Sequence, residues 1–301
     1  MKKRTYAYAQ FSPLDFAFFR IQGSGLGNLL LPWARYVLYT KQPGIQGIAP
    51  TWAQFKPGPY LRNEKDKRGY VGLFRARKNE LTGLRKALVL LSKKRRNENY
   101  LSELTVRSDE LVVFSGLGRY FQPLHEHHAF IRSSLLEIVK AKPQHPDWLT
   151  QAIAVHVRLG DFQQAGTSAF NTRLPLAWYI ENVRKLRELL GQDTPLAIFS
   201  DGSDAELKDL LSLRHAERMD FGSAMADLLA LSQARVLVAS NSTFSAWASF
   251  LGRMPSLWHG TGYIKDVYPQ GTGSELCIEA GSAIELDSLE RLVLGADSCG
   301  S

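Results

Sequence analysis

The sequence lacks the features that mark several specialised classes of protein. Its 301 residues hold only two cysteines, Cys277 and Cys299, which suit a reducing compartment and offer no metal-ligand spacing. No apolar run reaches the roughly 20 residues that a membrane-spanning helix needs. The basic start leads into a short apolar stretch without a cleavage site of the A-x-A type, so we expect no signal peptide. With 45% hydrophobic and 22% charged residues, the composition predicts a globular, cytoplasmic protein.

Acidic residues are scarce in the first third of the chain. Residues 1–100 hold 20 Lys or Arg against 5 Asp or Glu, whereas residues 201–301 hold 7 against 14. This asymmetry indicates that the N-terminal part meets an anionic partner, although a solvated basic surface is the simpler alternative. The basic residues 85–96 lack the interleaved aromatic residues of a base-stacking platform. Residues 81–96 fit better as an amphipathic helix with a basic end, on the core or at a membrane surface.

Short apolar runs alternate with amphipathic segments along most of the chain. This alternation is typical of βαβ units and parallel sheets. We expect strands at 16–21, 152–157, 196–200 and 235–240, and helices at 29–40, 176–191, 203–213, 223–234 and 243–252.

A segment with two prolines, residues 140–150, is the best candidate for a linker. It divides the chain into an N-terminal domain, residues 1–145, and a C-terminal domain, residues 146–301. Each half opens with a strand, a turn and a helix, so we expect two Rossmann-like domains that face a central cleft. In such sheets, ligands bind at the carboxyl ends of the strands.

Three polar residues follow the strand predicted at 152–157. His156, Arg158 and Asp161 lie in the stretch "HVRLGD". The planar guanidinium of Arg158 could clamp a phosphate, or it could pair with Asp161 or another carboxylate. His156 could contribute to a site or be a hydrogen-bonded core histidine.

A glycine-rich turn and a serine-rich turn each precede a predicted helix. Gly23, Gly25 and Gly27 could let backbone N–H groups approach a phosphate, but their spacing is not the dinucleotide fingerprint and a tight turn explains them equally well. In the stretch "SNSTF", Ser242 or Thr243 can cap the next helix. The same geometry aims the positive end of the helix dipole at the edge of the sheet, where it could hold a diphosphate.

The stretch "HEHH", with His125, His127 and His128, fits no zinc template. We interpret it as a solvated helix start.

In order along the chain, these stretches resemble those of glycosyltransferase family 11, the α-1,2-fucosyltransferases. The family's G-G-L-G-N-Q, G-Y-F-Q, H-x-R-R-G-D, F-S-D-D and S-N-S-T-F-S-W-W correspond here to "GSGLGNL", "GRYFQP", "HVRLGD", "FSDG" and "SNSTFSAW". The resemblance spans residues 20–250 and includes an acidic residue, Asp227, on the helix before the last of these stretches. This sequence departs from the pattern at Leu29, Leu159, Gly202 and Ala246.

The resemblance implies a GT-B fold and inverting transfer of L-fucose from GDP-fucose, without a required metal or other cofactor. It implies that the C-terminal domain binds the nucleotide sugar, that the N-terminal domain lies on the acceptor side, and that the glycine-rich turn closes over the donor. Arg158, Asp161 and His156 are then the catalytic candidates, with Asp15 as a further candidate base. The implied donor-binding residues are Gly23, Gly25, Gly27, Asn28, His156, Arg158, Asp201, Asp227, Asn241, Ser242, Thr243 and Phe244.

The expected partners are a nucleotide sugar and an oligosaccharide or lipid-linked glycan of a bacterial surface polysaccharide. The basic N-terminal half could contact the anionic inner membrane face, and we expect no nucleic acid partner. Two alternatives stay open: the same fold with another nucleotide sugar, and a non-catalytic basic protein that binds nucleic acid.

Overall fold

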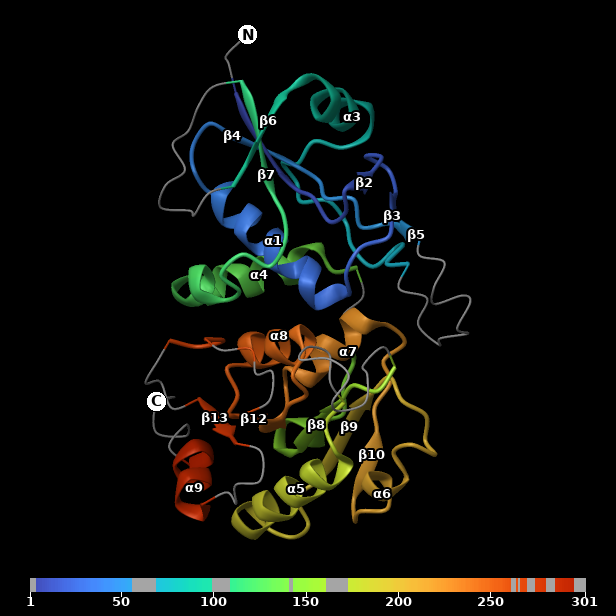
Figure 1. Ribbon diagram of the computed structural model, residues 1–301, viewed down its shortest axis with the longest axis vertical. Helices are drawn as coiled ribbons and strands as arrows, with labels where there is room; N and C mark the ends of the chain where they lie inside the picture. Colours follow the sequence, from blue (N-terminus) through green and yellow to red (C-terminus); the bar gives the residue numbers. More distant parts are fainter. Residues whose placement is uncertain are drawn as a thin grey trace. The chain divides into compact units, whose positions relative to one another are not determined.

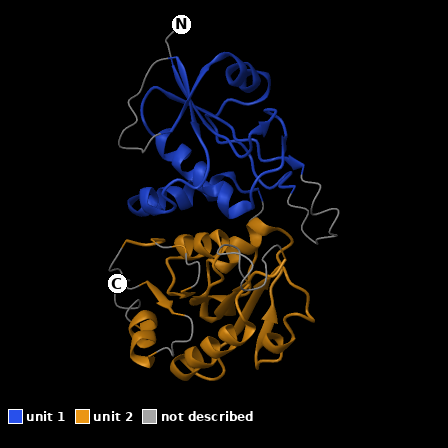
Figure 2. Ribbon diagram, in the orientation of Figure 1, with its two compact units in different colours: residues 1–142 blue, residues 143–301 orange. Residues whose placement is uncertain are grey.

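The structure is a computed structural model. It describes residues 4–55, 69–98, 109–140, 143–160, 173–260, 264, 266–269, 274–279 and 285–294. The chain forms two compact units, residues 1–142 and residues 143–301 (Figure 2). The division falls within the proline-containing segment, three residues before the expected boundary at 145/146.

Unit 1 is built on a parallel sheet with the strand order β4-β1-β7-β6 (Figure 1). The central strand β1 (Thr5–Ala9) pairs with β4 (Ile45–Ile48) and with β7 (Glu110–Phe114), and β6 (Lys94–Asn97) lies at the edge. Alternating tyrosine and alanine side chains let β1 pack between its two neighbours, and most of this strand is buried.

The prediction of a strand at residues 16–21 was wrong. Residues 16–19 form a turn between two short antiparallel strands, β2 (Leu14–Asp15) and β3 (Arg20–Ile21), and β3 also pairs with β5 (Gln54–Phe55). The backbone N–H of Phe16 donates to the carbonyl of Phe19, which closes the turn. Three of its phenylalanine side chains are exposed, so the apolar run that suggested a buried strand is a surface feature.

Helices of unit 1 pack beside its sheet or follow its strands. The buried helix α1 (Leu26–Tyr39) confirms the helix expected at 29–40 and packs on β1 and β7. Helix α3 (Gly83–Ser92) is shorter than expected, because the basic residues after it extend as the edge strand β6. The 3-10 helix η2 (Gln122–His127) leads into α4 (His128–Ile138), so the three clustered histidines do stand at a helix start.

Unit 2 contains a six-stranded sheet in which every pair of neighbours is parallel. Counted along the unit, its strand order is 3-2-1-4-5-6, the order typical of the dinucleotide-binding fold. The strands are β8 (Ile153–Val157), β9 (Leu196–Ser200), β10 (Ala216–Arg218), β11 (Val236–Val238), β12 (Ser256–His259) and β13 (Glu275–Ile278).

Helices cover both faces of this sheet (Figure 1). Side chains of α5 (Leu176–Leu190), α6 (Lys208–Leu211) and α9 (Leu286–Leu294) join one hydrophobic core with the strands. Helices α7 (Ala224–Leu231) and α8 (Thr243–Gly252) pack against each other. A 3-10 helix, η3 (Asp147–Gln151), precedes β8.

The strands and helices expected in the second half are confirmed, except that α6 is much shorter than the helix expected at 203–213. Glu206 bonds back to the backbone N–H and hydroxyl of Ser203, which stabilises a turn where a longer helix was expected. The α/β class, with Rossmann-like units and parallel sheets, is also confirmed. The cleft between the units stays a prediction. Among the described residues, no helix is both long enough and apolar enough to cross a membrane.

Candidate functional site

The candidate site of unit 2 lies where β8 and β11 are neighbours. From this pair, the strand order runs in opposite directions, so the helices that follow the two strands cover opposite faces of the sheet. Open α/β sheets bind ligands in the crevice at the carboxyl ends of such a pair. His156 and Arg158 lie at the end of β8, and residues 240–245 lie between β11 and the first turn of α8.

His156 and three serines form a buried hydrogen-bonded cluster across this junction. The Nδ1 atom of His156 lies 2.7 Å from the hydroxyl of Ser245 and 2.9 Å from that of Ser240. The Ser240 hydroxyl also lies 3.0 Å from the hydroxyl of Ser242. The Phe244 ring lies beside the imidazole, with ring centroids 4.9 Å apart. One nitrogen of His156 is therefore committed to serines that follow the neighbouring strand.

Burial holds the imidazole of His156 neutral. It lowers the pKa of His156 to about 3, the positive charge of Arg158 contributes to the lowering, and Asp201 opposes it. A neutral imidazole at this depth can position a ligand through hydrogen bonds. With so low a pKa, it is a weak acceptor of a proton in general base catalysis.

Ser242 is the N-cap of α8, one of the two roles that the sequence left open. Its hydroxyl accepts a hydrogen bond from the backbone N–H of Ser245 at 3.2 Å. Asn241 precedes the cap and Thr243 is the first helical residue. The positive end of the α8 dipole thus lies at the carboxyl edge of the sheet. Sequence reasoning missed Ser245, although its position three residues after the cap could have indicated the contact.

Arg158 pairs with the carboxylate of Asp201, which follows β9. The Nη1 atom of Arg158 lies 2.7 Å from Oδ2 of Asp201, and the other carboxylate oxygen accepts from the backbone N–H of Leu159 at 2.8 Å. Asp201 therefore links the ends of two neighbouring strands and orients the guanidinium. About a fifth of the Arg158 side chain is exposed, so the group is held in place but still reachable.

Two of the departures from the family pattern, Leu159 and Gly202, lie against each other. A Cβ atom added at Gly202 would come 2.5 Å from Cδ1 of Leu159, which is itself buried. In the family pattern an arginine and an aspartate occupy these two positions. Here an apolar side chain over a glycine replaces that oppositely charged pair.

Asp227 stabilises a loop rather than taking part in the His156 cluster. It lies in the first turn of α7, and its Oδ1 accepts from the backbone N–H of Phe221 at 2.7 Å. This bond braces the loop that precedes α7.

The glycine-rich turn belongs to unit 1, at the N-terminus of α1. At Gly23, where φ is +121°, an added Cβ would lie 2.2 Å from Nη1 of Arg20, so both conformation and close packing require glycine. Gly25 is the N-cap residue of α1, while Gly27 and Asn28 lie in its first turn. Contact between this turn and a ligand of unit 2 stays a prediction.

Asp161, the proposed base, lies outside the described residues. Within the part of the chain that the structure describes, no three His, Cys, Asp or Glu side chains gather as a possible metal site.

Residues 124–257 match the family described as Glycosyl transferase family 11. This segment contains "HVRLGD", "FSDG" and "SNSTFSAW" together with the strands that carry them. No curated protein matches the chain.

Among solved structures, the chain is similar to fucosyltransferase NodZ from Bradyrhizobium, at 13% identity and a TM-score of 0.48, over 85% of this chain and 95% of that one. It is similar to POFUT1 in complex with GDP at 12% identity and a TM-score of 0.45, over 84% and 98%. For heptosyltransferase WaaC from E. coli with ADP, the values are 12% and 0.44, over 96% and 99%. At this distance, the likenesses assign neither a donor nor an acceptor.

Proposed function

We propose that this chain, a glycosyltransferase whose residues 124–257 belong to glycosyl transferase family 11, moves L-fucose from GDP-fucose to a sugar hydroxyl. The proposed reaction inverts the anomeric carbon and forms an α-1,2 linkage on a bacterial surface glycan. The observation that carries the proposal is the meeting of Arg158 and the N-terminus of α8 at the junction of β8 and β11.

Arg158 would stabilise the leaving diphosphate. As the bond between the sugar and the diphosphate breaks, negative charge develops on the phosphate oxygens. A guanidinium already held by Asp201 needs little reorganisation at that moment, and the dipole of α8 adds positive potential from the neighbouring strand. These groups supply charge that a bound metal ion would otherwise supply, so we propose a metal-independent reaction with no cofactor.

The remaining site residues would hold the nucleotide sugar. His156 would position it as a neutral hydrogen-bonding group, beside the ring of Phe244. Asp201 would act through Arg158, because both of its oxygens are already engaged. The proposed donor contacts further include Gly23, Gly25, Gly27, Asn28, Asp227, Asn241, Ser242 and Thr243.

The acceptor hydroxyl needs a base to take its proton as it attacks the anomeric carbon. We assign this role to Asp161. The low pKa of His156 makes that residue a weaker candidate for a base.

We also propose that unit 1 touches the anionic inner face of a membrane through α3. Leu84, Leu88 and Leu91 are 76%, 66% and 86% exposed, and their spacing places them on one side of the helix. The helix contains no acidic residue; Arg85 on the helix and Lys94, two residues after its end, are exposed. An apolar stripe flanked by cations complements an anionic bilayer surface.

A thermal-shift experiment with nucleotides tests the proposed donor. GDP should raise the melting temperature, whereas UDP and ADP at the same concentration should have little effect. A ligand at 100 times its Kd stabilises the folded state by about 2.7 kcal/mol. A stronger response to UDP would favour another donor on the same fold. Salt-sensitive binding of DNA without any nucleotide response would instead favour the non-catalytic alternative.

A further inference from the structure

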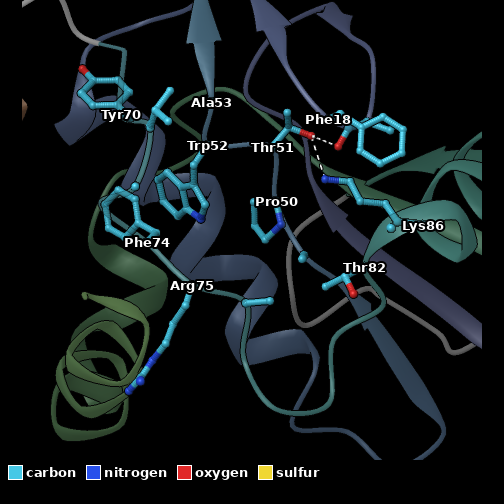
Figure 3. A pocket seen from close by; sticks show the side chains of 16 residues that line it. Phe18, Pro50, Thr51, Trp52, Ala53, Tyr70, Phe74, Arg75, Thr82 and Lys86 are labelled. Atoms are coloured by element: carbon cyan, nitrogen blue, oxygen red, sulfur yellow. Dashed lines mark hydrogen bonds between the residues drawn. The ribbon is translucent and has the colours of Figure 1, made fainter.

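Unit 1 has a pocket of its own, with a volume of about 270 Å³ (Figure 3). Its lining includes residues 49–53, which directly follow β4, and the start of α3. The pocket therefore lies at the carboxyl edge of a parallel sheet, the edge at which such sheets bind ligands. None of its lining residues is among the site residues expected from the sequence.

The pocket contains a buried positive charge, and no described acidic residue lines it. Lys86 and Arg75 are among its lining residues. The Nε atom of Arg75 donates to the backbone carbonyl of Glu137 at 2.7 Å, and its side chain points away from Lys86 in Figure 3, so Lys86 is the cation available to a ligand. Lys86 is only 5% exposed, and its ammonium donates to the hydroxyl of Thr51 at 2.8 Å, the bond drawn in Figure 3. The Thr51 hydroxyl is neutral and does not balance the charge of Lys86. Among the described residues, no carboxylate is in direct contact with this ammonium group.

The nearest acidic group does not compensate this charge directly. Asp15 accepts hydrogen bonds from the hydroxyl of Tyr8 and from the backbone N–H of Ala17. Burial lowers the pKa of Lys86 to about 8, and Asp15 and Glu80 counteract only part of that effect. Lys86 is therefore charged at neutral pH, at a cost in desolvation that an anionic ligand would offset.

The rest of the pocket offers apolar surface suited to a ring. The Phe18 side chain is 56% exposed at the pocket, and Trp52 stacks on Phe74 with ring centroids 3.8 Å apart. Binding pockets commonly combine such apolar walls with a few polar groups that orient the ligand. The C–H face of a sugar ring can pack on an aromatic side chain while a charged substituent reaches the cation.

We propose that this pocket binds the acceptor through a negatively charged group, and hence that the acceptor is an acidic sugar. Lys86 holds its carboxylate or phosphate, and Phe18 packs against its ring. The assignment of the ligand as an acceptor rests on the glycosyltransferase function proposed above. The binding of an anionic sugar to this pocket does not depend on that function.

Calorimetric titration of the full chain with galacturonate, galactose 1-phosphate and galactose tests the proposal. At least one anionic sugar should bind, and galactose should bind at least about tenfold more weakly, the ratio of a contact worth about 1.4 kcal/mol. The first two ligands distinguish a carboxylate from a phosphate. Equal affinity for galactose and the anionic sugars, or no binding of either anionic sugar, would overturn the proposal.

Variants locate the binding in the pocket. Lys86→Met and Phe18→Ser should each weaken anionic sugar binding about tenfold or more, whereas Lys78→Met, which removes an exposed lysine outside the lining, should not. Phe18 is largely exposed, so its replacement keeps the test valid even where Lys86→Met disturbs folding. Unchanged binding in folded Phe18→Ser and Lys86→Met proteins would contradict the assignment.

GDP binding separates this proposal from the proposed function. Both variants should keep the thermal shift produced by GDP. Loss of the GDP response in Lys86→Met would show that the pocket holds the nucleotide, which overturns the acceptor assignment. If the protein binds an anionic sugar but GDP does not raise its melting temperature, the pocket assignment holds. The proposed use of a GDP-linked donor would then be contradicted.

Discussion

At the scale of single residues, the ends of neighbouring strands determine what surrounds the two central residues of the candidate site, Arg158 and His156. Arg158 is oriented by Asp201, and His156 is kept neutral by burial between β8 and the serines that follow β11. The Arg158–Asp201 pair is partly exposed to solvent, whereas the contacts of His156 with the serines are buried. The two residues therefore suit different tasks, Arg158 as a fixed positive charge and His156 as a neutral hydrogen-bonding group.

The depressed pKa of His156 predicts a loss of stability in mild acid. Below pH 6.5 the histidine of the unfolded chain takes up a proton, while the folded ring, with a pKa of about 3, does not. Between pH 6.5 and about 3, this group should therefore lower the free energy of unfolding by about 1.4 kcal/mol for each pH unit, and it should contribute no pH dependence above pH 6.5.

Urea unfolding of the wild type and of His156→Asn between pH 7 and pH 5 measures this effect. Carboxylates and Arg158 affect the unfolding free energy of both proteins. The difference between the two slopes of unfolding free energy against pH therefore reports the protonation of His156. The variant should lose the part of the pH dependence of its unfolding free energy that corresponds to the uptake of about one proton. Parallel slopes would show that His156 titrates in the folded protein as it does in the unfolded chain.

Leu159 and Gly202 should behave as one unit in a double-mutant cycle. Gly202→Asp places a Cβ atom 2.5 Å from Cδ1 of the buried Leu159 and should cost about 1–3 kcal/mol of stability. In a Leu159→Arg background the aspartate gains a partner and the clash is removed, so we expect a coupling energy of about 0.5–3 kcal/mol. Additive effects in denaturant unfolding would contradict direct coupling.

The sequence is enough to choose candidate site residues, but not to predict their contacts. The order of the motifs along the chain is enough to single out Arg158, His156, Asp201 and Ser242. The sequence left open which carboxylate pairs with Arg158, and its pairing with Asp201 depends on β9 lying beside β8. Contacts between residues so far apart in sequence follow from strand order, which the periodicity of side chains does not encode.

At the scale of elements, unit 2 was more predictable than unit 1. Apart from His156 and Ser200, the strands β8, β9 and β11 consist of apolar residues, so their burial on both faces is visible in the sequence. In unit 1 the central strand β1 alternates tyrosine with alanine, whereas the apolar run after it forms a turn with exposed phenylalanine side chains. A run of phenylalanines indicated burial and instead marked a surface.

The exposed leucine face of α3 predicts membrane binding that depends on anionic lipid. The wild type should co-sediment with vesicles of phosphatidylglycerol and phosphatidylcholine and much less with phosphatidylcholine alone. Replacing Leu84, Leu88 and Leu91 together by glutamine removes the apolar contribution of three largely exposed side chains, and should weaken binding at least about tenfold.

Leu286→Gln with Leu294→Gln is the matched control, because both leucines are exposed on α9 of the other unit. This variant should sediment as the wild type does. Binding that ignores the anionic lipid, or that survives the triple replacement on α3, would count against a membrane role for this helix.

At the scale of the whole molecule, the two units differ sharply in charge. Residues 1–142 hold 25 Lys or Arg against 10 Asp or Glu, and residues 143–301 hold 12 against 19. The basic unit carries the leucine face of α3 and the cationic pocket around Lys86, while the acidic unit carries the junction of β8 and β11. This difference in charge supports the proposal that unit 1 binds an anionic acceptor.

The release of GDP from GDP-fucose, measured in the presence of EDTA, tests the central claim most directly. The wild type and Arg214→Ala, which breaks a surface arginine–aspartate pair of 2.9 Å, should release GDP at similar rates. Arg158→Ala should be at least about a hundredfold slower, the loss of about 2.7–4 kcal/mol of transition-state stabilisation, with an unchanged unfolding transition. Near-wild-type release by Arg158→Ala, or no release by the wild type without metal, would contradict the account.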